Sequence, residues 1–180
     1  MSRRQEILDI AAEEFARRGF HGVSIADLGR ACGVSGPALY KHFESKQELL
    51  AEMLTTISEE LLREGDRRVS VAADADEALA ALIAWHVDFA LQHPALIVVQ
   101  DRDWGALPEA AREQVRRTQR AYVDLWAGVL RALHPAVQPA QARARVHAVF
   151  GLINSTPHSA KVPPEELRVV LTEMAGAALT

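Results

Sequence analysis

The sequence predicts an all-α fold with an N-terminal three-helix module, arranged as a helix-turn-helix, followed by a larger helical bundle. Apolar residues recur at intervals of three and four along most of the 180 residues. Capping residues or prolines stand where nearly every such segment begins. We therefore expect two domains, formed by residues 1–45 and 46–180.

The first expected helix covers residues 3–18, where Leu8, Ala11 and Phe15 share an apolar face and Gly19 ends the helix. Ser24 can N-cap a second helix, with Asp27 as the reciprocal partner of a capping box.

Gly33 is a natural C-terminal residue for that second helix, and Ser35 immediately caps a third, with Pro37 in its first turn. Two helices separated by so short a turn are a helix-turn-helix.

The third helix has two distinguishable faces. Leu39 and Phe43 point inward, whereas the opposite face carries small side chains, a cation, a phenol and an imidazole, which suit a major groove. The alternative is an ordinary helical hairpin with a solvated face. We expect Lys41 to read a base, and Tyr40 and Lys46 to contact phosphates. The full set of predicted DNA-binding residues is Arg4, Ser24, Ser35, Pro37, Ala38, Tyr40, Lys41, His42 and Lys46.

The pattern Gly33-Val34-Ser35-x-x-x-Leu39-Tyr40-x-His42-Phe43-x-Ser45-Lys46-x-x-Leu49, preceded by Ser24-Ile25-x-x-Leu28, resembles the signature of TetR-family transcriptional regulators. The resemblance lies within residues 1–50. It implies a homodimer on a palindromic DNA operator and a small-molecule pocket in the second domain. It also implies that the last two helices form a four-helix bundle with the partner subunit.

Composition agrees with this interpretation. The net charge is −4, yet residues 1–50 hold seven basic and seven acidic side chains, so DNA affinity should come from a few well-placed phosphate contacts. The sequence contains no run of 18 apolar residues, so we expect no membrane span. The N-terminus leads into an amphipathic helix, so we expect no signal peptide. The single cysteine, Cys32, fits a reducing cytoplasm and is expected to be a buried structural thiol.

In the second domain, one helix should run from Lys46 to about Arg67 and join the two domains. The helices expected after it cover residues 74–93, 95–99, 108–133, 139–154 and 164–179, with a polar connection at residues 101–105. The helix at residues 74–93 is apolar on nearly all sides, which places it at the centre of a bundle.

Aromatic side chains gather on these helices, and bundles place ligands between helices. The predicted ligand-pocket residues are Trp85, His86, Phe89, Trp104, Tyr122, Trp126 and Asn154. The plainer interpretation is an aromatic core. His86 and His93 lie two turns apart and could hold a metal, but with no third ligand evident we favour structural histidines and expect neither metal nor cofactor.

A row of arginines, Arg112, Arg116 and Arg120, recurs at every fourth position. A solvated face with ion pairs is the favoured interpretation, and an anchor for a phosphorylated ligand such as an acyl-CoA is the alternative. On the last two helices, apolar residues beyond one core contact suggest self-association. The predicted dimerisation residues are Val149, Ile153, Leu167, Leu171 and Met174.

The sequence thus predicts a repressor that leaves its operator when a largely apolar effector tilts the helix from Lys46 and changes the spacing of the two DNA-reading helices. A ligand-independent or activating regulator is the alternative. A helical enzyme or scaffold fused to a DNA-binding module is a third possibility, but no catalytic constellation stands out.

Overall fold

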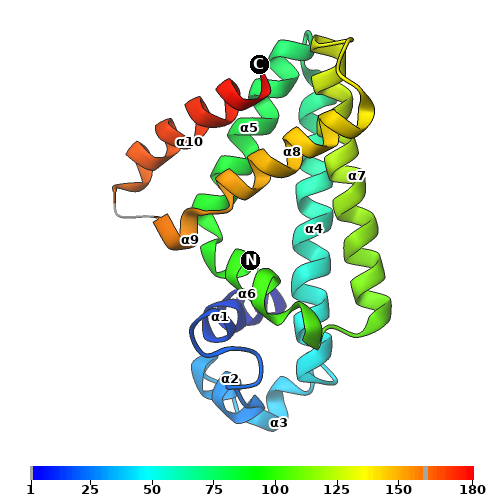
Figure 1. Cartoon of the computed structure of the whole chain (residues 1–180). Coiled ribbons are helices and arrows are strands. Elements are labelled where there is room, and N and C mark those ends of the chain that lie inside the picture. Colours follow the sequence, from blue (N-terminus) through cyan, green and yellow to red (C-terminus); the bar gives the residue numbers. More distant parts are fainter. Residues whose placement is uncertain (1, 160–161) are drawn as a thin grey trace. The chain divides into compact units, whose positions relative to one another are not determined.

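The computed structural model describes residues 2–159 and 162–180, and these residues form helices and no strand (Figure 1). The all-α class is therefore confirmed. Within the described ranges, no single helix combines the length and the apolar composition needed to cross a membrane.

The chain divides into two compact units that are each discontinuous in sequence. The first takes the chain up to Ile57 together with Ala95–Val115, and the second takes Ser58–Pro94 and the chain from Arg116 onward. Helices α4 (Lys46–Val71) and α7 (Glu109–Leu133) each contribute residues to both units. The division after residue 45 was predicted on functional grounds, and it stays a prediction.

The first unit begins with α1 (Arg3–Arg18), α2 (Ile25–Ala31) and the one-turn α3 (Gly36–Leu39), followed by the start of α4. Its core is one apolar cluster around Phe15, Leu28 and Leu39. The later segment adds α6 (Pro94–Asp103), the 3-10 helix η1 (Trp104–Ala106) and the first turns of α7 to the same cluster.

Helix α6 is longer than predicted, because the polar residues at its end find partners inside the unit. The guanidinium of Arg102 donates to the carbonyl oxygens of Phe15 and Ala16 at the end of α1, and it pairs with the buried carboxylate of Asp103. A cation is favourable at a helix C-terminus, where carbonyls lack partners within the helix. Residues 101–103 are therefore helical, and not a loose connection.

The second unit is a bundle of the remaining helices. It contains the rest of α4, α5 (Ala75–Gln92), the rest of α7, α8 (Pro139–Ile153), the short α9 (Thr156–Ser159) and α10 (Pro164–Leu179). Helix α10 packs on α5 and on α8. The predicted helices at residues 74–93, 108–133, 139–154 and 164–179 all agree with these bounds to within one or two residues.

Four of the five residues predicted for the dimer contact lie inside one chain. Val149, Ile153, Leu167 and Leu171 are buried, because the apolar stripes of α8 and α10 face each other and α5. They are not available to a second chain, so a contact between protomers needs other residues. Met174 alone of the five is exposed, at 51%.

A close approach of α4 to α7 and α5 occurs at Gly65. A Cβ atom there would lie 2.7 Å from Tyr122 Cε2 and 3.3 Å from methyl groups of Leu125 and Leu82. Because Tyr122 is buried, its ring cannot move aside freely.

We expect Gly65→Ala to lower the free energy of unfolding, because overpacking costs about 1–3 kcal/mol and exceeds the better helix propensity of alanine. Gly128→Ala in α7 is the matched control, since nothing lies within 4 Å of the added methyl. This control should gain up to about 1 kcal/mol. Urea denaturation of both variants measures the difference, and an unchanged or raised stability of Gly65→Ala would contradict the close contact.

Candidate functional site

A capping box shapes the start of α2, and a glycine shapes the turn between α2 and α3. Ser24 Oγ accepts from Asp27 N–H (3.1 Å) while the Asp27 carboxylate accepts from Ser24 N–H (2.9 Å), the predicted capping box. Gly33 has a φ of 67°, a left-handed conformation that glycine adopts without strain. Hydrogen bonds from Ser24, aided by the Arg18 guanidinium, hold the pKa of Asp27 well below its usual range.

Helix α3 presents the predicted DNA-contacting residues on its outer face. Ser35 caps it by accepting from Ala38 N–H (3.3 Å), and the helical turn continues to Phe43. Leu39 and Phe43 are buried, whereas Ser35, Pro37, Tyr40 and Lys41 are exposed, Tyr40 at 54%. Ala38 and His42 are half-buried beside them. We call these six non-core residues, Ser35, Pro37, Ala38, Tyr40, Lys41 and His42, the outer face of α3.

Lys46 lies behind that face. Its ammonium donates to the carbonyl oxygens of Phe20 and Val23, both at 2.7 Å, and lies 4.2 Å from the centre of the Phe20 ring. Burial lowers the pKa of Lys46, and the nearby Asp103 carboxylate opposes that effect. With two of its three N–H donors engaged, Lys46 supports the turn after α1. A phosphate contact by Lys46 stays a prediction.

Arg4 is also engaged within the unit. Its guanidinium forms a two-pronged pair with Glu52, donates to the carbonyl of His42 and lies 4.2 Å from the centre of the Phe43 ring. The hydrogen bond that Arg4 donates to Glu52 raises the pKa of Arg4. Arg4 thereby ties α1 to the end of the α3 turn and to α4, and its predicted contact with DNA also remains a prediction.

The second unit contains a buried cluster of rings around His86. The His86 ring is stacked on Phe150 (centroids 4.4 Å apart) and on Tyr122 (5.8 Å), with Trp126 edge-on at 6.0 Å. His86 Nε2 lies 3.1 Å from Asn154 Oδ1, and Nδ1 lies 3.4 Å from the Tyr122 hydroxyl. Phe89 lies at the edge of the cluster, 6.1 Å from His86. We call these residues the His86 cluster.

Burial dominates the electrostatics of the cluster. It lowers the pKa of His86 to about 4, although the hydrogen bond with Asn154 acts in the opposite direction. Burial likewise raises the pKa of Tyr122. His86 is therefore neutral near pH 7, and a neutral imidazole can donate to Asn154 through Nε2 and accept from Tyr122 at Nδ1.

Two of the predicted pocket residues lie elsewhere. Trp85 turns toward α4, where its Nε1 donates to the Leu61 carbonyl (3.3 Å) and Arg68 lies over its ring. Trp104 belongs to the first unit and packs against that unit's core. Phe150 belongs to the cluster, although it was not among the predicted pocket residues. Its position one helical turn before Asn154 puts both side chains on the same face of the chain, and this spacing could have revealed it.

The suggested metal pair finds no support. Among the described residues, no group of three or more histidine, cysteine or acidic side chains could hold a metal ion. His86 contacts Asn154 and Tyr122, whereas His93 faces Phe89, with ring centroids 5.3 Å apart.

We expect the buried neutral His86 to make stability depend on pH. Above about pH 6.5 the imidazole is neutral in both folded and unfolded chains. Between pH 6.5 and 4 only the unfolded chain takes up the proton, so the free energy of unfolding should fall by about 1.4 kcal/mol per pH unit as pH falls.

Urea denaturation between pH 7 and 5 measures this slope. His86→Gln should show a shallower slope than the wild type, and the exposed His158→Gln should keep the wild-type slope. An identical slope in wild type and His86→Gln would show that His86 is not the group responsible.

Two family models match the chain. Residues 7–53 match the family model of bacterial regulatory proteins of the tetR family, and residues 72–158 match the model of the tetracyclin repressor-like C-terminal domain. A curated relative is the HTH-type transcriptional repressor KstR2 of Rhodococcus jostii (strain RHA1), 30% identical over 131 residues. That match covers 72% of this chain and 64% of KstR2, so the similarity spans less than two thirds of the relative's length.

Solved structures share the fold. A TetR-family transcriptional regulator from Bordetella parapertussis 12822 is 28% identical with a TM-score of 0.84, and the match covers 96% of this chain and 93% of that one. AibR in complex with isovaleryl coenzyme A and operator DNA is 18% identical with a TM-score of 0.77, covering 96% and 97% of the two chains. With the two family models matching most of its length, the chain belongs to the tetR family of bacterial regulatory proteins.

Proposed function

We propose that this protein is a ligand-responsive transcriptional repressor that binds a palindromic operator as a homodimer, and that it is not an enzyme. The observation that carries the proposal is the outer face of α3, which presents Pro37, Tyr40 and Lys41 to solvent on a capped helix-turn-helix. The resemblance to the repressor KstR2, and the presence of operator DNA in the AibR complex, support it.

The outer face of α3 suits entry into the major groove. Pro37 and Ala38 are small enough to let the helix approach the base edges, and Lys41 can donate to guanine O6 and N7. Within this face, the Ser35 and Tyr40 hydroxyls and the His42 imidazole can reach phosphate oxygens, as can the Ser24 hydroxyl at the start of α2. Arg4 and Lys46 support the face from inside the unit.

We expect Lys41→Ala to weaken operator binding and to relax the preference at one base position by about 1–3 kcal/mol, because a direct base contact is lost. Fluorescence anisotropy on a selected operator and on single-base variants measures both effects. Arg63→Ala, which removes an exposed cation from the part of α4 in the second unit, is the control and should bind like the wild type. A uniform loss across all sequences would assign Lys41 to a phosphate instead.

Lys46→Met separates the supporting role from a phosphate contact. If the ammonium mainly holds the Phe20 and Val23 carbonyls, the variant should melt at a lower temperature and should bind all DNA sequences less well. If Lys46 mainly contacts a phosphate, the melting temperature should stay unchanged. The slope of log affinity against log salt should then fall in magnitude by about one.

The proposed homodimer uses the exposed sides of α8 and α10. On α10, Val169, Val170 and Met174 are large apolar side chains exposed to solvent. On α8, the exposed Ala144, Ala148 and Gly151 form a stripe of small residues that lets another helix come close. Two such helices from each protomer would form a four-helix contact.

We expect Val170→Glu and Met174→Glu to yield monomers, because each places a charge in an apolar contact. Val71→Glu, at an exposed valine at the end of α4, is the matched control and should remain dimeric. Light scattering coupled to size-exclusion chromatography measures the mass. Dimers in both α10 variants would place the contact between protomers elsewhere.

We propose the His86 cluster as the effector site. Its rings offer apolar walls, while Asn154, Tyr122 and His86 offer hydrogen-bonding groups for one or two polar atoms of a ligand. Isovaleryl coenzyme A in the AibR complex supports an acyl coenzyme A as the effector class. Helix α5, which carries His86 and Phe89, continues through Pro94 into α6, whose Arg102 contacts the end of α1.

An effector could act along this continuous stretch of chain. It must bind the DNA-incompetent state more tightly than the DNA-competent one, since equal affinity shifts no population. Opening the ring stack around His86 would displace α5 and, through Pro94, the start of α6. In the homodimer this displacement would change the separation of the two α3 helices from the roughly 34–36 Å that successive half-sites require.

A further inference from the structure

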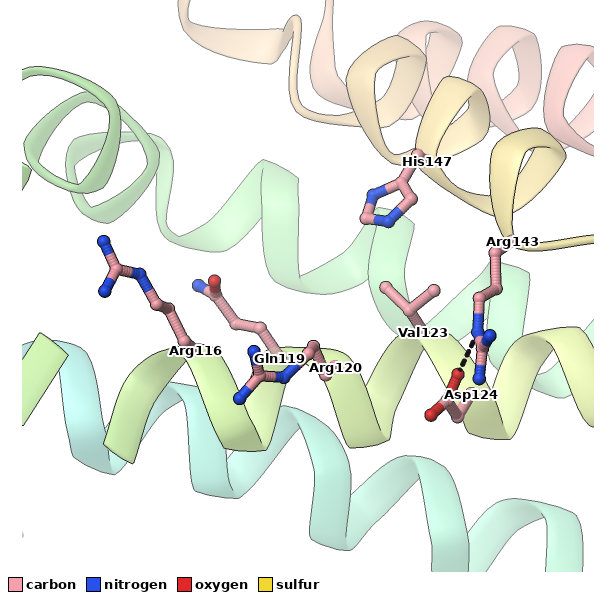
Figure 2. Close-up of a pocket in the computed structure, with 7 residues that line it drawn as sticks. All are labelled: Arg116, Gln119, Arg120, Val123, Asp124, Arg143 and His147. Atoms are coloured by element: carbon pink, nitrogen blue, oxygen red, sulfur yellow. Dashed lines mark hydrogen bonds and ion pairs between the residues drawn. The ribbon is translucent and has the colours of Figure 1, made fainter. Parts of the chain in front are cut away.

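A hollow of about 490 Å³ lies between α7 and α8 within the second unit (Figure 2). Helix α7 contributes Arg116, Gln119, Arg120, Val123 and Asp124, and α8 contributes Arg143 and His147. In Figure 2 the Arg116 and Gln119 side chains rise from α7 on one side of the hollow, and His147 extends from α8 on the other. We call this site the basic hollow.

The charges around the hollow are predominantly positive. Three guanidinium groups and one carboxylate line it. That carboxylate, Asp124, pairs with Arg143 at 2.6 Å and so does little to repel an incoming anion. Arg112, one turn before Arg116, lies outside the hollow and pairs with Glu109 at 2.6 Å. The arginine row therefore divides by position into the half-buried Arg112, which lies outside the hollow, and the exposed Arg116 and Arg120, which line it.

The chemistry of the lining matches phosphate. A guanidinium presents planar N–H donors that fit two phosphate oxygens at once, and the Gln119 amide adds a further donor. Arg116 and Arg120 lie one helical turn apart, so both can face one anion. The volume is that of a small-molecule site, and Val123 supplies an apolar contact beside the charges.

We propose that the basic hollow binds the phosphate groups of a small-molecule ligand. The same two helices carry the His86 cluster, since Tyr122 and Trp126 belong to α7 and Phe150 to α8. A phosphate bound outside and an apolar group bound inside would thus act on one pair of helices. The inference rests on the proposed effector response and extends it by assigning the anionic end of the effector to a site.

Isothermal titration calorimetry of the full chain, without DNA, tests the proposal. The probes are coenzyme A and inorganic pyrophosphate. Both should bind the wild type at one site per chain, and Arg116→Gln and Arg120→Gln should each weaken binding about tenfold or more. Arg116→Lys, which keeps the charge but loses the planar fork, should lie between wild type and Arg116→Gln.

The matched control is Arg117→Gln, which removes the same charge from the neighbouring residue of α7 outside the hollow. It should bind both probes within about twofold of the wild type, because screened surface charges contribute little. An equal loss in Arg117→Gln would reduce the effect to overall charge and overturn the proposal, as would the absence of binding by both probes at millimolar concentration.

The two probes distinguish the sources of phosphate. Tighter binding of coenzyme A supports a nucleotide-bearing ligand, and equal binding of pyrophosphate supports a site for the phosphate anion itself. Operator binding by Arg116→Gln, measured separately by anisotropy, should equal that of the wild type. If operator binding is intact while neither probe binds, the basic hollow fails as a site and the proposed regulator remains.

Discussion

The arrangement of helices in the first unit depends on the Lys46 ammonium, which donates to two backbone carbonyls in the turn between α1 and α2. Buried carbonyls without a donor are costly, so these two bonds from Lys46 matter for the turn. A lysine at the first position of α4 reaches both, with Asp103 of α6 offsetting part of its desolvation. The start of α4, the turn after α1 and the end of α6 are thereby fixed in one arrangement, against which α2 and α3 pack.

Two other cations in this unit also donate hydrogen bonds to backbone carbonyls. Arg102 donates to carbonyls at the end of α1, and Arg4 donates to the carbonyl of His42. The first fifty residues carry equal numbers of basic and acidic side chains, and the cations Arg4 and Lys46 are engaged with backbone carbonyls. We therefore do not expect a broad basic surface on this unit. For a protein that binds DNA, this leaves Lys41 and the polar groups around α3 to supply affinity, and it favours a few directional contacts over a broad electrostatic field.

In the second unit, α7 separates two kinds of chemistry. Its inner side contributes Tyr122 and Trp126 to the buried ring cluster, where desolvation keeps His86 neutral and the His86 ring nitrogens pair with Asn154 and Tyr122. Its outer side contributes Arg116 and Arg120 to the basic hollow. A ligand with an apolar body and an anionic end matches this division, and Gly65 shows how tightly the inner side is already packed.

The sequence by itself determined most of the helices, because the capping box at Ser24, the left-handed Gly33 and the helix-starting prolines act within a few residues of the chain. Tertiary structure alone decided what each apolar or charged face contacts. Periodicity shows that Leu167 and Leu171 share a stripe, but not that their own chain covers it. Periodicity likewise does not show that Lys46 donates to backbone carbonyls, because these contacts join residues distant in sequence. For the same reason it does not show that Trp104 lies outside the His86 cluster and that Phe150 lies in it.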